Sequence, residues 1–306
     1  MENLKADFWR NVPAPTRESS WRDQGARWWN RALDALARVD AQTVLNTATA
    51  SRGNVSGNVD MELRRLMNRL HAEAYDAERN SFDYARVASS DLFLRLRETA
   101  ALLVAFDPLT LRTEEQQLAF WINLYNVLVM QGVIAFGMHK TVWEDWGFFR
   151  RTAYCIGGQR IAADHIEHGI LRRNQTPPYT PFPVFAPTDS RTKWMLPRLD
   201  PRIHAALHCA SRSCPPIAVY DPANIFAQLD LAARAFVNAT THLDFERTTI
   251  FLSPIFKWYA QDFGGRDGIL EFVSGYWQAE AQANRLWDAR AKLRLAWTRY
   301  DWTLNR

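Results

Sequence analysis

The sequence is poor in the residues and patterns that mark several large classes of protein. Only 13 of its 306 residues are glycine, against a usual share of about 7%, and no glycine-rich phosphate loop occurs. The patterns G-x-S-x-G, H-E-x-x-H and paired C-x-x-C are also missing. No apolar run approaches the roughly 18 residues that a membrane span needs. These absences argue against P-loop ATPases, Rossmann dehydrogenases, α/β-hydrolases, zincins and transmembrane proteins.

The sequence also has few cysteines and a small net charge. The three cysteines, Cys155, Cys209 and Cys214, are too few for a secreted disulfide scaffold. The first ten residues are interrupted by charges and lack the apolar stretch of a signal peptide. We therefore expect a cytoplasmic protein with free thiols. Lys and Arg number 37 and Asp and Glu 33, and these charges are interspersed, so we expect no nucleic-acid partner.

The first half of the chain has the composition and spacing of a helical protein. Apolar residues recur at helical intervals over residues 18–39, 59–74 and 91–106. A fourth, very apolar helix begins at a capping box of Thr113 and Gln116, ends near residue 136, and should be buried. The segment 47–58, rich in Thr, Ser, Asn and Gly, predicts a flexible joint.

The second half alternates strands with short helices. Residues 152–162, with Gly157-Gly158 at the centre, predict a hairpin. Asp164 and Glu167 predict a capping box that starts a short helix. The remaining predicted elements are a proline-rich lid or arm over 177–187, strands over 203–208, 248–252 and 293–298, and helices over 254–262, over 267–283 and from Asp221-Pro222. This order favours an α+β fold, mostly helical, with a small and largely antiparallel sheet.

One short segment gathers two of the seven histidines and two of the three cysteines. On the predicted strand, His204 and His208 share one face and Cys209 points to the other. The turn that follows contains Arg212 and should lift Cys214 out of the sheet, where a cation and an imidazole would stabilise a thiolate. The alternative is that both cysteines are small buried hydrophobes.

Other polar residues lie among apolar ones. Asn123 and Asn126 are three residues apart on the apolar helix, and a buried amide needs hydrogen-bond partners. They either bracket loops to the helix or orient a base or an oxyanion. His168 lies three residues before Leu171, on the apolar side of the short helix. It is either a hydrogen-bonded core residue or a base.

Five motifs occur in the order typical of one family. They are AFWINLYN, IEHGILR, RIHAALHCASRSCPPI, IFKWY and YDWTLN. Together they resemble the family known as domain of unknown function 547 and cover about residues 82–305. We therefore expect a helical extension over 1–80 and a family domain over 81–306. His208 departs from the pattern, which has a less ionisable residue before the first cysteine.

The resemblance implies two kinds of biology. Relatives include chains fused to glutaredoxin-type modules, which implies thiol metabolism, and plant proteins with leucine-zipper regions, which implies assembly. The set of Cys, His and Asn is similar to that of papain-like and transglutaminase-like enzymes. That comparison is an analogy, because the chain order Asn, His, Cys would require a rearranged topology.

We predict a thiol-dependent hydrolase or acyltransferase that acts on an amide, peptide or thioester. Its nucleophile would be Cys214, because a free thiol needs a base to ionise at neutral pH. The general base would be His168 or His204. The predicted helpers are Asn123 and Asn126, which orient the base or bind the oxyanion, and Arg212, Trp121 and Glu167, which contact the substrate.

Three alternatives stay open. Cys209 and Cys214 could cycle between dithiol and disulfide in glutathione-type metabolism. The same histidines and cysteines could bind zinc, although their spacing matches no standard site. The chain could instead be an interaction module, in which the motifs are structural brackets, Trp121 is a core residue and the amphipathic N-terminal helices recruit a partner. We expect a small-molecule or peptide substrate that can itself contain a thiol, no cofactor or metal, and no membrane span.

Overall fold

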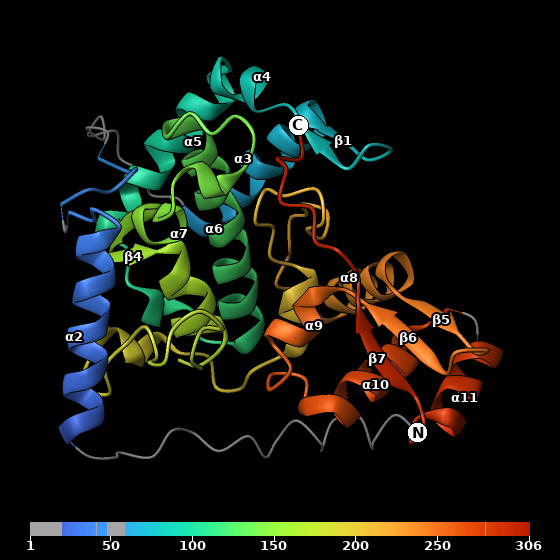
Figure 1. Cartoon of the computed structure of the whole chain (residues 1–306). Coiled ribbons are helices and arrows are strands. Elements are labelled where there is room, and N and C mark those ends of the chain that lie inside the picture. The colour runs from blue at the N-terminus through green and yellow to red at the C-terminus, as the bar shows by residue number, and fades with distance from the viewer. Residues whose placement is uncertain (1–19, 41, 48–58, 279) are drawn as a thin grey trace. The chain divides into compact units, whose positions relative to one another are not determined.

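The chain folds into two compact units (Figure 1). The computed structural model describes residues 20–40, 42–47, 59–278 and 280–306. Unit 1 comprises the described residues up to Leu199 together with Leu207–Ile225 and Trp302–Arg306, and unit 2 comprises Asp200–Ala206 and Phe226–Asp301. Helices predominate, and the described strands form three small sheets, so the predicted α+β class is confirmed. The papain-like analogy and the predicted boundary at residue 80 remain predictions.

Unit 1 is built around one buried helix, α6 (Glu114–Ala135). Its predicted capping box is present: the side chain of Thr113 accepts from the backbone of Gln116, whose own side chain reaches back. Helices α3 and α4 and the segment η5 contact it. The elements of unit 1 are α2 (Ser20–Leu36), α3 (Val59–Ala74), α4 (Tyr84–Ala88), α5 (Asp91–Ala101), α7 (Phe148–Arg151) and the π-helix η5 (His165–Leu171), with strands β1 (Tyr75–Asp76), β2 (Ser81–Phe82), β3 (Ala153–Ile156) and β4 (Gln159–Ala162).

Helix α6 has the length and composition of a membrane span. Its most apolar window has a mean hydropathy of 1.6, and 89% of that window is buried inside the structure. A helix buried in the core of a protein is apolar on all sides, so it has the same composition as a membrane span. The burial of α6 is that of a core helix. The expected absence of a membrane span stays a prediction.

The hairpin β3–β4 forms as its sequence predicts. Cys155 pairs with Arg160 and Ile156 with Gln159 across the two-residue turn. Gly157 and Gly158 both have positive φ, +53° and +76°. This geometry suits a type I′ turn, which other residues rarely adopt.

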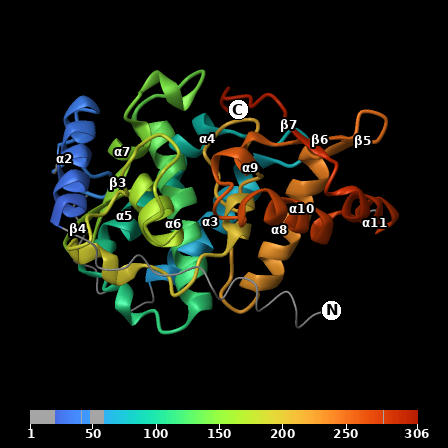
Figure 2. The same cartoon turned by 60° about the horizontal axis from the view of Figure 1, so that its bottom comes forward.

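Unit 2 is a helical unit with one three-stranded sheet. Strand β6 (Thr249–Leu252) lies in the middle, antiparallel to β5 (His242–Asp244) and parallel to β7 (Arg294–Trp297). The helices are α8 (Ile225–Thr240), α9 (Pro254–Trp258), α10 (Gly265–Tyr276) and α11 (Glu280–Ala289). Phe256, Phe263 and Phe272 form the centre of its core. Figure 2 shows α10 and α11 next to each other in this unit.

Three sequence predictions about secondary structure are wrong. Residues 203–208 do not form a strand: Asp200 caps a 3₁₀ turn, η7 (Pro201–Ala205), and irregular backbone follows. The helix expected over 267–283 is divided into α10 and α11. The helix expected from Asp221-Pro222 begins at Ile225, because the Asp221 carboxylate closes a turn on the Ala223 N–H first. Beyond residue 47, the predicted joint lies outside the described residues.

Candidate functional site

The irregular loop after η7 brings two cysteines together. Cys209 and Cys214 form a disulfide, with their Cα atoms 6.1 Å apart. On the predicted strand Cys209 would have faced away, but no strand forms and the chain turns back between the two residues. The expectation of free thiols is therefore wrong for this pair. Cys155, in β3, is a free cysteine.

The two sulfurs of this disulfide loop (residues 209–214) have unequal surroundings. Cys209 is half-buried, whereas Cys214 is only 5% exposed. The backbone N–H of Cys209 donates to the Cys214 sulfur at 3.0 Å, and the Ser211 hydroxyl donates to the same sulfur at 3.3 Å. The Ser211 hydroxyl lies at the same distance, 3.3 Å, from the Cys209 sulfur. The Cys209 N–H is therefore the donor that distinguishes the Cys214 sulfur and favours a negative charge there.

The disulfide loop is fixed by the last residues of unit 1. Asn305 donates its N–H to the Ala210 carbonyl at 3.1 Å, and Arg212 donates its N–H to the Thr303 carbonyl at 2.9 Å. Ala210 has φ +65°. A non-glycine residue there costs about 1–2 kcal/mol, so the surrounding contacts must hold the turn. The Arg212 side chain is exposed.

His208 precedes this loop and is held as a neutral imidazole. Its Nδ1–H donates to the Pro215 carbonyl at 2.8 Å, which leaves the lone pair on Nε2. Burial lowers the pKa of the His208 ring. Its backbone N–H donates to Asn126 Oδ1 at 2.9 Å. The side chain of Asn126 thus ties this loop to α6.

Asn123 makes a similar bracket on the same helix. It donates to the Tyr220 carbonyl at 2.8 Å and accepts from the Tyr220 N–H at 2.9 Å. Trp121 is a core residue, edge-on to Phe120 and 6.2 Å from Trp194 between ring centroids. These contacts agree with the bracketing alternative, and the catalytic roles of both asparagines stay predictions.

A second polar centre surrounds η5. Six ionisable side chains are buried there within unit 1, which we call the η5 cluster: Arg150, Asp164, His165, Glu167, His168 and Arg172. The predicted capping box of Asp164 and Glu167 is wrong. Asp164 has helical dihedral angles and its side chain caps nothing. Instead its carboxylate accepts from the Tyr179 hydroxyl at 2.6 Å. Segment η5 is a π-helix, and π-helical turns are rare and recur at functional sites.

Both ring nitrogens of His168 face charged groups of this cluster. The Arg172 guanidinium lies 2.9 Å from Nδ1, so that nitrogen accepts. Asp164 Oδ1 lies 4.0 Å from Nε2, and Glu167 Oε1 lies 3.8 Å from Nδ1. The Tyr125 hydroxyl donates to the other oxygen of Glu167 at 3.0 Å. The Arg172 hydrogen bond therefore orients the ring, and both carboxylates lie within 4.0 Å of its nitrogens.

Burial controls the charge states in the η5 cluster. Desolvation raises the pKa of Asp164 to about 6, although the Arg150 guanidinium opposes this shift. Arg150 Nη1 lies 3.9 Å from Asp164 Oδ2. Desolvation and neighbouring arginines hold the pKa of His165 well below its usual value. A carboxyl group that titrates near neutral pH and a neutral imidazole thus lie one residue apart.

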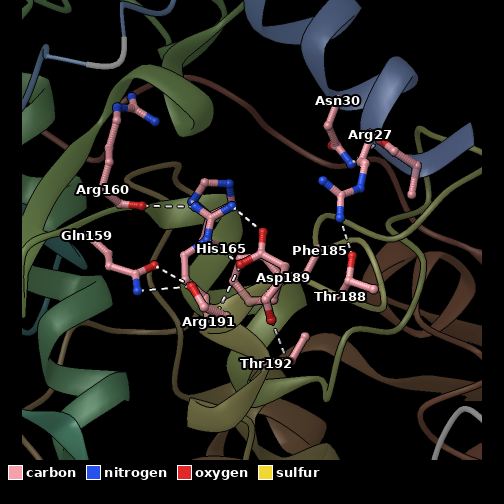
Figure 3. A network of polar contacts seen from close by, with 12 residues as sticks. Arg27, Asn30, Gln159, Arg160, His165, Phe185, Thr188, Asp189, Arg191 and Thr192 are labelled. Carbon is pink, nitrogen blue, oxygen red and sulfur yellow. Dashed lines mark hydrogen bonds and ion pairs between the residues drawn. The ribbon is translucent and has the colours of Figure 1, made fainter. Parts of the chain in front are cut away.

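Figure 3 shows the network that joins η5 to the proline-rich segment. Arg191 binds Asp189 through two nitrogens, at 3.0 and 2.7 Å, and its Nη1 lies 3.2 Å from His165 Nδ1. Its guanidinium also covers the Phe185 ring. A Cβ on Gly169 would lie 2.3 Å from that ring, so only glycine fits. The proline-rich segment is therefore packed on η5 as an arm.

His204, the other predicted base, lies in unit 2. Its Nε2 lies 2.8 Å from Asp262 Oδ2, and its ring stacks on Tyr259 with centroids 4.1 Å apart. The structure thus assigns His204 to one unit and His168, Glu167, Trp121, both asparagines, Arg212 and the two cysteines to the other.

The comparison with protein families covers all of these residues, His204 included. Residues 109–237 match the family described as protein of unknown function, DUF547. This part of the chain is similar to DUF547. The resemblance stated from the motifs is confirmed there, while the motifs IFKWY and YDWTLN lie beyond the matched residues. No curated protein and no solved structure matches the chain.

The DUF547 segment contains α6, the η5 cluster and the disulfide loop. Sequence reasoning missed four members of these sites: Arg150, Arg172, Tyr125 and Tyr179. Two of them had a signal, since Tyr125 lies inside the motif AFWINLYN and Arg172 ends the motif IEHGILR. Among the described residues, no group of three or more His, Cys, Asp or Glu side chains is arranged to hold a metal ion.

Proposed function

We propose that the DUF547 segment carries a dithiol–disulfide redox centre formed by Cys209 and Cys214. The bond between these two sulfurs is the observation that supports it. Thiol–disulfide cycling is one of the three alternatives to a thiol hydrolase that the sequence leaves open. The strained backbone of Ala210 also favours it, because residues held at unfavourable dihedral angles cluster at functional sites.

The unequal surroundings of the two sulfurs give the exchange a direction. An external thiolate attacks the half-buried Cys209 sulfur and forms a mixed disulfide, while the electron pair of the broken bond goes to Cys214. The Cys209 N–H and the Ser211 hydroxyl stabilise that leaving thiolate. A second external thiolate then displaces Cys209, which takes up a proton, as does Cys214. Two electrons pass and an external disulfide is released.

The co-reactants of this exchange are thiols. We propose small thiol compounds or cysteine-containing peptides as substrates, in the reducing cytoplasm where glutathione-type thiols are abundant. The exposed Arg212 within the loop offers a positive charge to an anionic thiol.

Trapping the mixed disulfide tests the proposal. Cys214→Ser leaves Cys209 with no partner, so oxidised glutathione should add one glutathionyl group to it, as measured by intact-protein mass spectrometry. Cys209→Ser is the matched variant and should react more slowly, since Cys214 is buried. Cys155→Ser should leave the parent's exchange unchanged.

Two results would contradict the redox proposal. One is a parent protein that gains no two-dalton mass on mild oxidation after reduction. The other is a Cys214→Ser variant whose Cys209 reacts with oxidised glutathione no faster than Cys155 does.

The predicted thiol hydrolase or acyltransferase is a second candidate. The two hydrogen bonds to the Cys214 sulfur favour it as well, because they would stabilise a nucleophilic thiolate in the reduced protein. Cys209→Ser isolates that state. Iodoacetamide should then label Cys214 at pH 6 faster than it labels a peptide thiol. The labelling rate is corrected for burial by comparison with the rate for the same variant unfolded in urea. An equal or slower rate excludes this candidate.

A further inference from the structure

Helix α2 presents apolar side chains to solvent at the edge of unit 1 (Figures 1 and 2). Trp21, Trp28 and Leu36 are 61, 67 and 71% exposed, and Ala35 is exposed as well. Residues seven and eight apart lie on the same side of a helix, so these four residues form one row, which we call the α2 stripe. It is about 22 Å long, since a helix rises about 1.5 Å per residue. Contiguous apolar surface of this kind marks interaction sites.

The opposite side of α2 is fixed to unit 1. Ala26 is fully buried there, and the Asn30 side chain donates to the Pro183 carbonyl at 2.9 Å. A Cβ on Gly147 would lie 2.6 Å from the Cβ of Ala37, so the backbone before α7 packs directly against the end of the helix. The helix cannot enter a groove that encloses it. The α2 stripe therefore fits a partner with a flat surface.

Arginines border the α2 stripe. Arg27 and Arg31 are exposed one turn apart on one side of the helix, and Arg38 is exposed in the turn that follows it. Arg27 pairs with Asp23 at 2.8 Å. Asp189, which Arg27 also attracts, has an ion pair of its own. In the part of the chain that the structure describes, Arg31 and Arg38 form no ion pair, so both are available to an anionic partner.

The carboxylates of α2 are engaged. Asp23 accepts from Arg27 at 2.8 Å, and Asp34 accepts from Arg150 at 2.9 Å. Asp40 lies beyond the helix, and its carboxylate accepts a backbone N–H. The α2 helix of a second copy would thus bring the same arginines and no free carboxylate of its own. The charges therefore favour an anionic partner over self-association.

We propose that α2 binds the surface of an anionic phospholipid membrane and lies along it. Amphipathic helices with Trp and Leu on one side and arginines beside them bury the apolar side at the boundary between headgroups and acyl chains. Trp28 suits this depth, because its ring is apolar and its indole N–H is polar. Arg31 and Arg38 bind the lipid phosphates. The proposal needs neither cysteine of the redox centre, and the helix rests on the bilayer without spanning it.

Vesicle flotation with the full-length protein tests the apolar part of this proposal. Vesicles that contain phosphatidylserine in phosphatidylcholine should carry the protein, and vesicles of phosphatidylcholine alone should carry far less of it. Trp28→Gln should weaken binding about tenfold or more, because burial of a large apolar side chain is lost. Trp146→Gln is the matched control and should bind like the parent. Trp146 is 57% exposed in the same unit, but it precedes Gly147, which packs on the opposite side of α2.

The charged part is tested by two double variants of equal net charge. Arg31→Gln with Arg38→Gln should weaken binding to the phosphatidylserine vesicles about tenfold. Arg69→Gln with Arg112→Gln removes two exposed arginines elsewhere in unit 1 and should leave binding unchanged. Circular dichroism and thermal unfolding verify that all variants are folded.

Three results overturn the membrane proposal. One is a parent protein that does not float with the phosphatidylserine vesicles. Another is an equal loss of binding in Trp28→Gln and Trp146→Gln. The third is a dimer, measured by analytical ultracentrifugation without lipid, that Trp28→Gln abolishes, since the α2 stripe would then belong to a second copy. Equal binding by the two double variants would overturn the contact between these arginines and lipid.

Discussion

The disulfide loop and the η5 cluster lie in the same unit and belong to the same family segment, but they are built in opposite ways. The loop is tied to its surroundings mainly by backbone hydrogen bonds and its imidazole is neutral. The η5 cluster buries carboxylates, guanidinium groups and imidazoles together. Reduction of the disulfide to two thiols therefore adds no buried charge to its neighbours, whereas loss of a charged member of the cluster leaves the charge of its partner uncompensated.

The histidines show the same contrast. His208 lies beside a backbone carbonyl and stays neutral, while His168 is held between Arg172 and two carboxylates. A ring fixed on both nitrogens is suited to positioning its neighbours. We therefore expect the chemically reactive groups to lie in the loop. Substitutions in the cluster should destabilise the protein most.

Removing a cation from the η5 cluster should produce the largest effect. Arg150→Ala deletes the guanidinium that faces Asp164 and binds Asp34, and loss of one partner of a buried ion pair costs about 3–5 kcal/mol. Urea unfolding measures this loss. The exposed Arg86→Ala is the control and should stay within about 0.5 kcal/mol of the parent. Similar values for the two variants would remove the contrast between the regions.

The raised pKa of Asp164 predicts the pH dependence of the cluster. Its folded value of about 6 exceeds the ordinary 3.8, so the folded state holds the proton more tightly. The stabilisation is complete below about pH 4 and is lost as the pH rises through 6; it amounts to about 1–3 kcal/mol.

Urea unfolding of the parent and of Asp164→Asn, from pH 4 to 7.5, isolates this effect. The lowered pKa values of His165 and His208 act in the opposite direction, since their stabilisation is lost as the pH falls. These contributions cancel in the difference between the two proteins. A difference that does not change with pH would show that Asp164 titrates normally.

Reduction of the disulfide should have a smaller effect, because the bridge closes a short loop. The chain-entropy relation gives about 2 kcal/mol for a loop of this size. Thermal unfolding with and without a phosphine reductant measures it, and the Cys209→Ser, Cys214→Ser double variant should not respond to reductant. A parent that is equally stable in both states would mean that the loop is held by its other contacts alone.

Tyr84→Phe should have the smallest effect on stability. It leaves the buried Asn305 carbonyl oxygen of the side chain without its donor, which costs about 1 kcal/mol. Because Asn305 also holds Ala210, the disulfide should be reduced faster by dithiothreitol in this variant. Tyr276→Phe, which removes a hydroxyl bound to Asp230 in unit 2, is the control. Equal reduction rates in all three proteins would uncouple Asn305 from the loop.

The sequence predicts local structure well where neighbours in the chain decide it. Thr113 with Gln116 and Gly157 with Gly158 formed the predicted cap and turn. The pair Asp164 and Glu167 has the same spacing as the first cap, yet no box forms. There the Tyr179 hydroxyl and the Arg150 guanidinium, from distant segments, compete for the Asp164 carboxylate, and tertiary contacts prevail over the local preference.

The site was predictable in its members but not in its grouping. Cys209 and Cys214 were identified, but the assumed strand separated them. The Asp200-Pro201 pair, a capping residue followed by proline, was the overlooked signal of a helical turn at that place. The contributions of Arg150 and Tyr179 could not be predicted, because nothing in their local sequence indicates which distant charge they meet.

Unit 1 is discontinuous in the sequence, so its parts are synthesised at different times. Residues Trp302–Arg306 belong to it, but the ribosome makes them only after the whole of Phe226–Asp301. Until they emerge, Ala210 and Arg212 lack these two backbone hydrogen-bond partners in the nascent protein. The backbone contacts that hold the disulfide loop are therefore completed only after the segment inserted into its own unit has been translated.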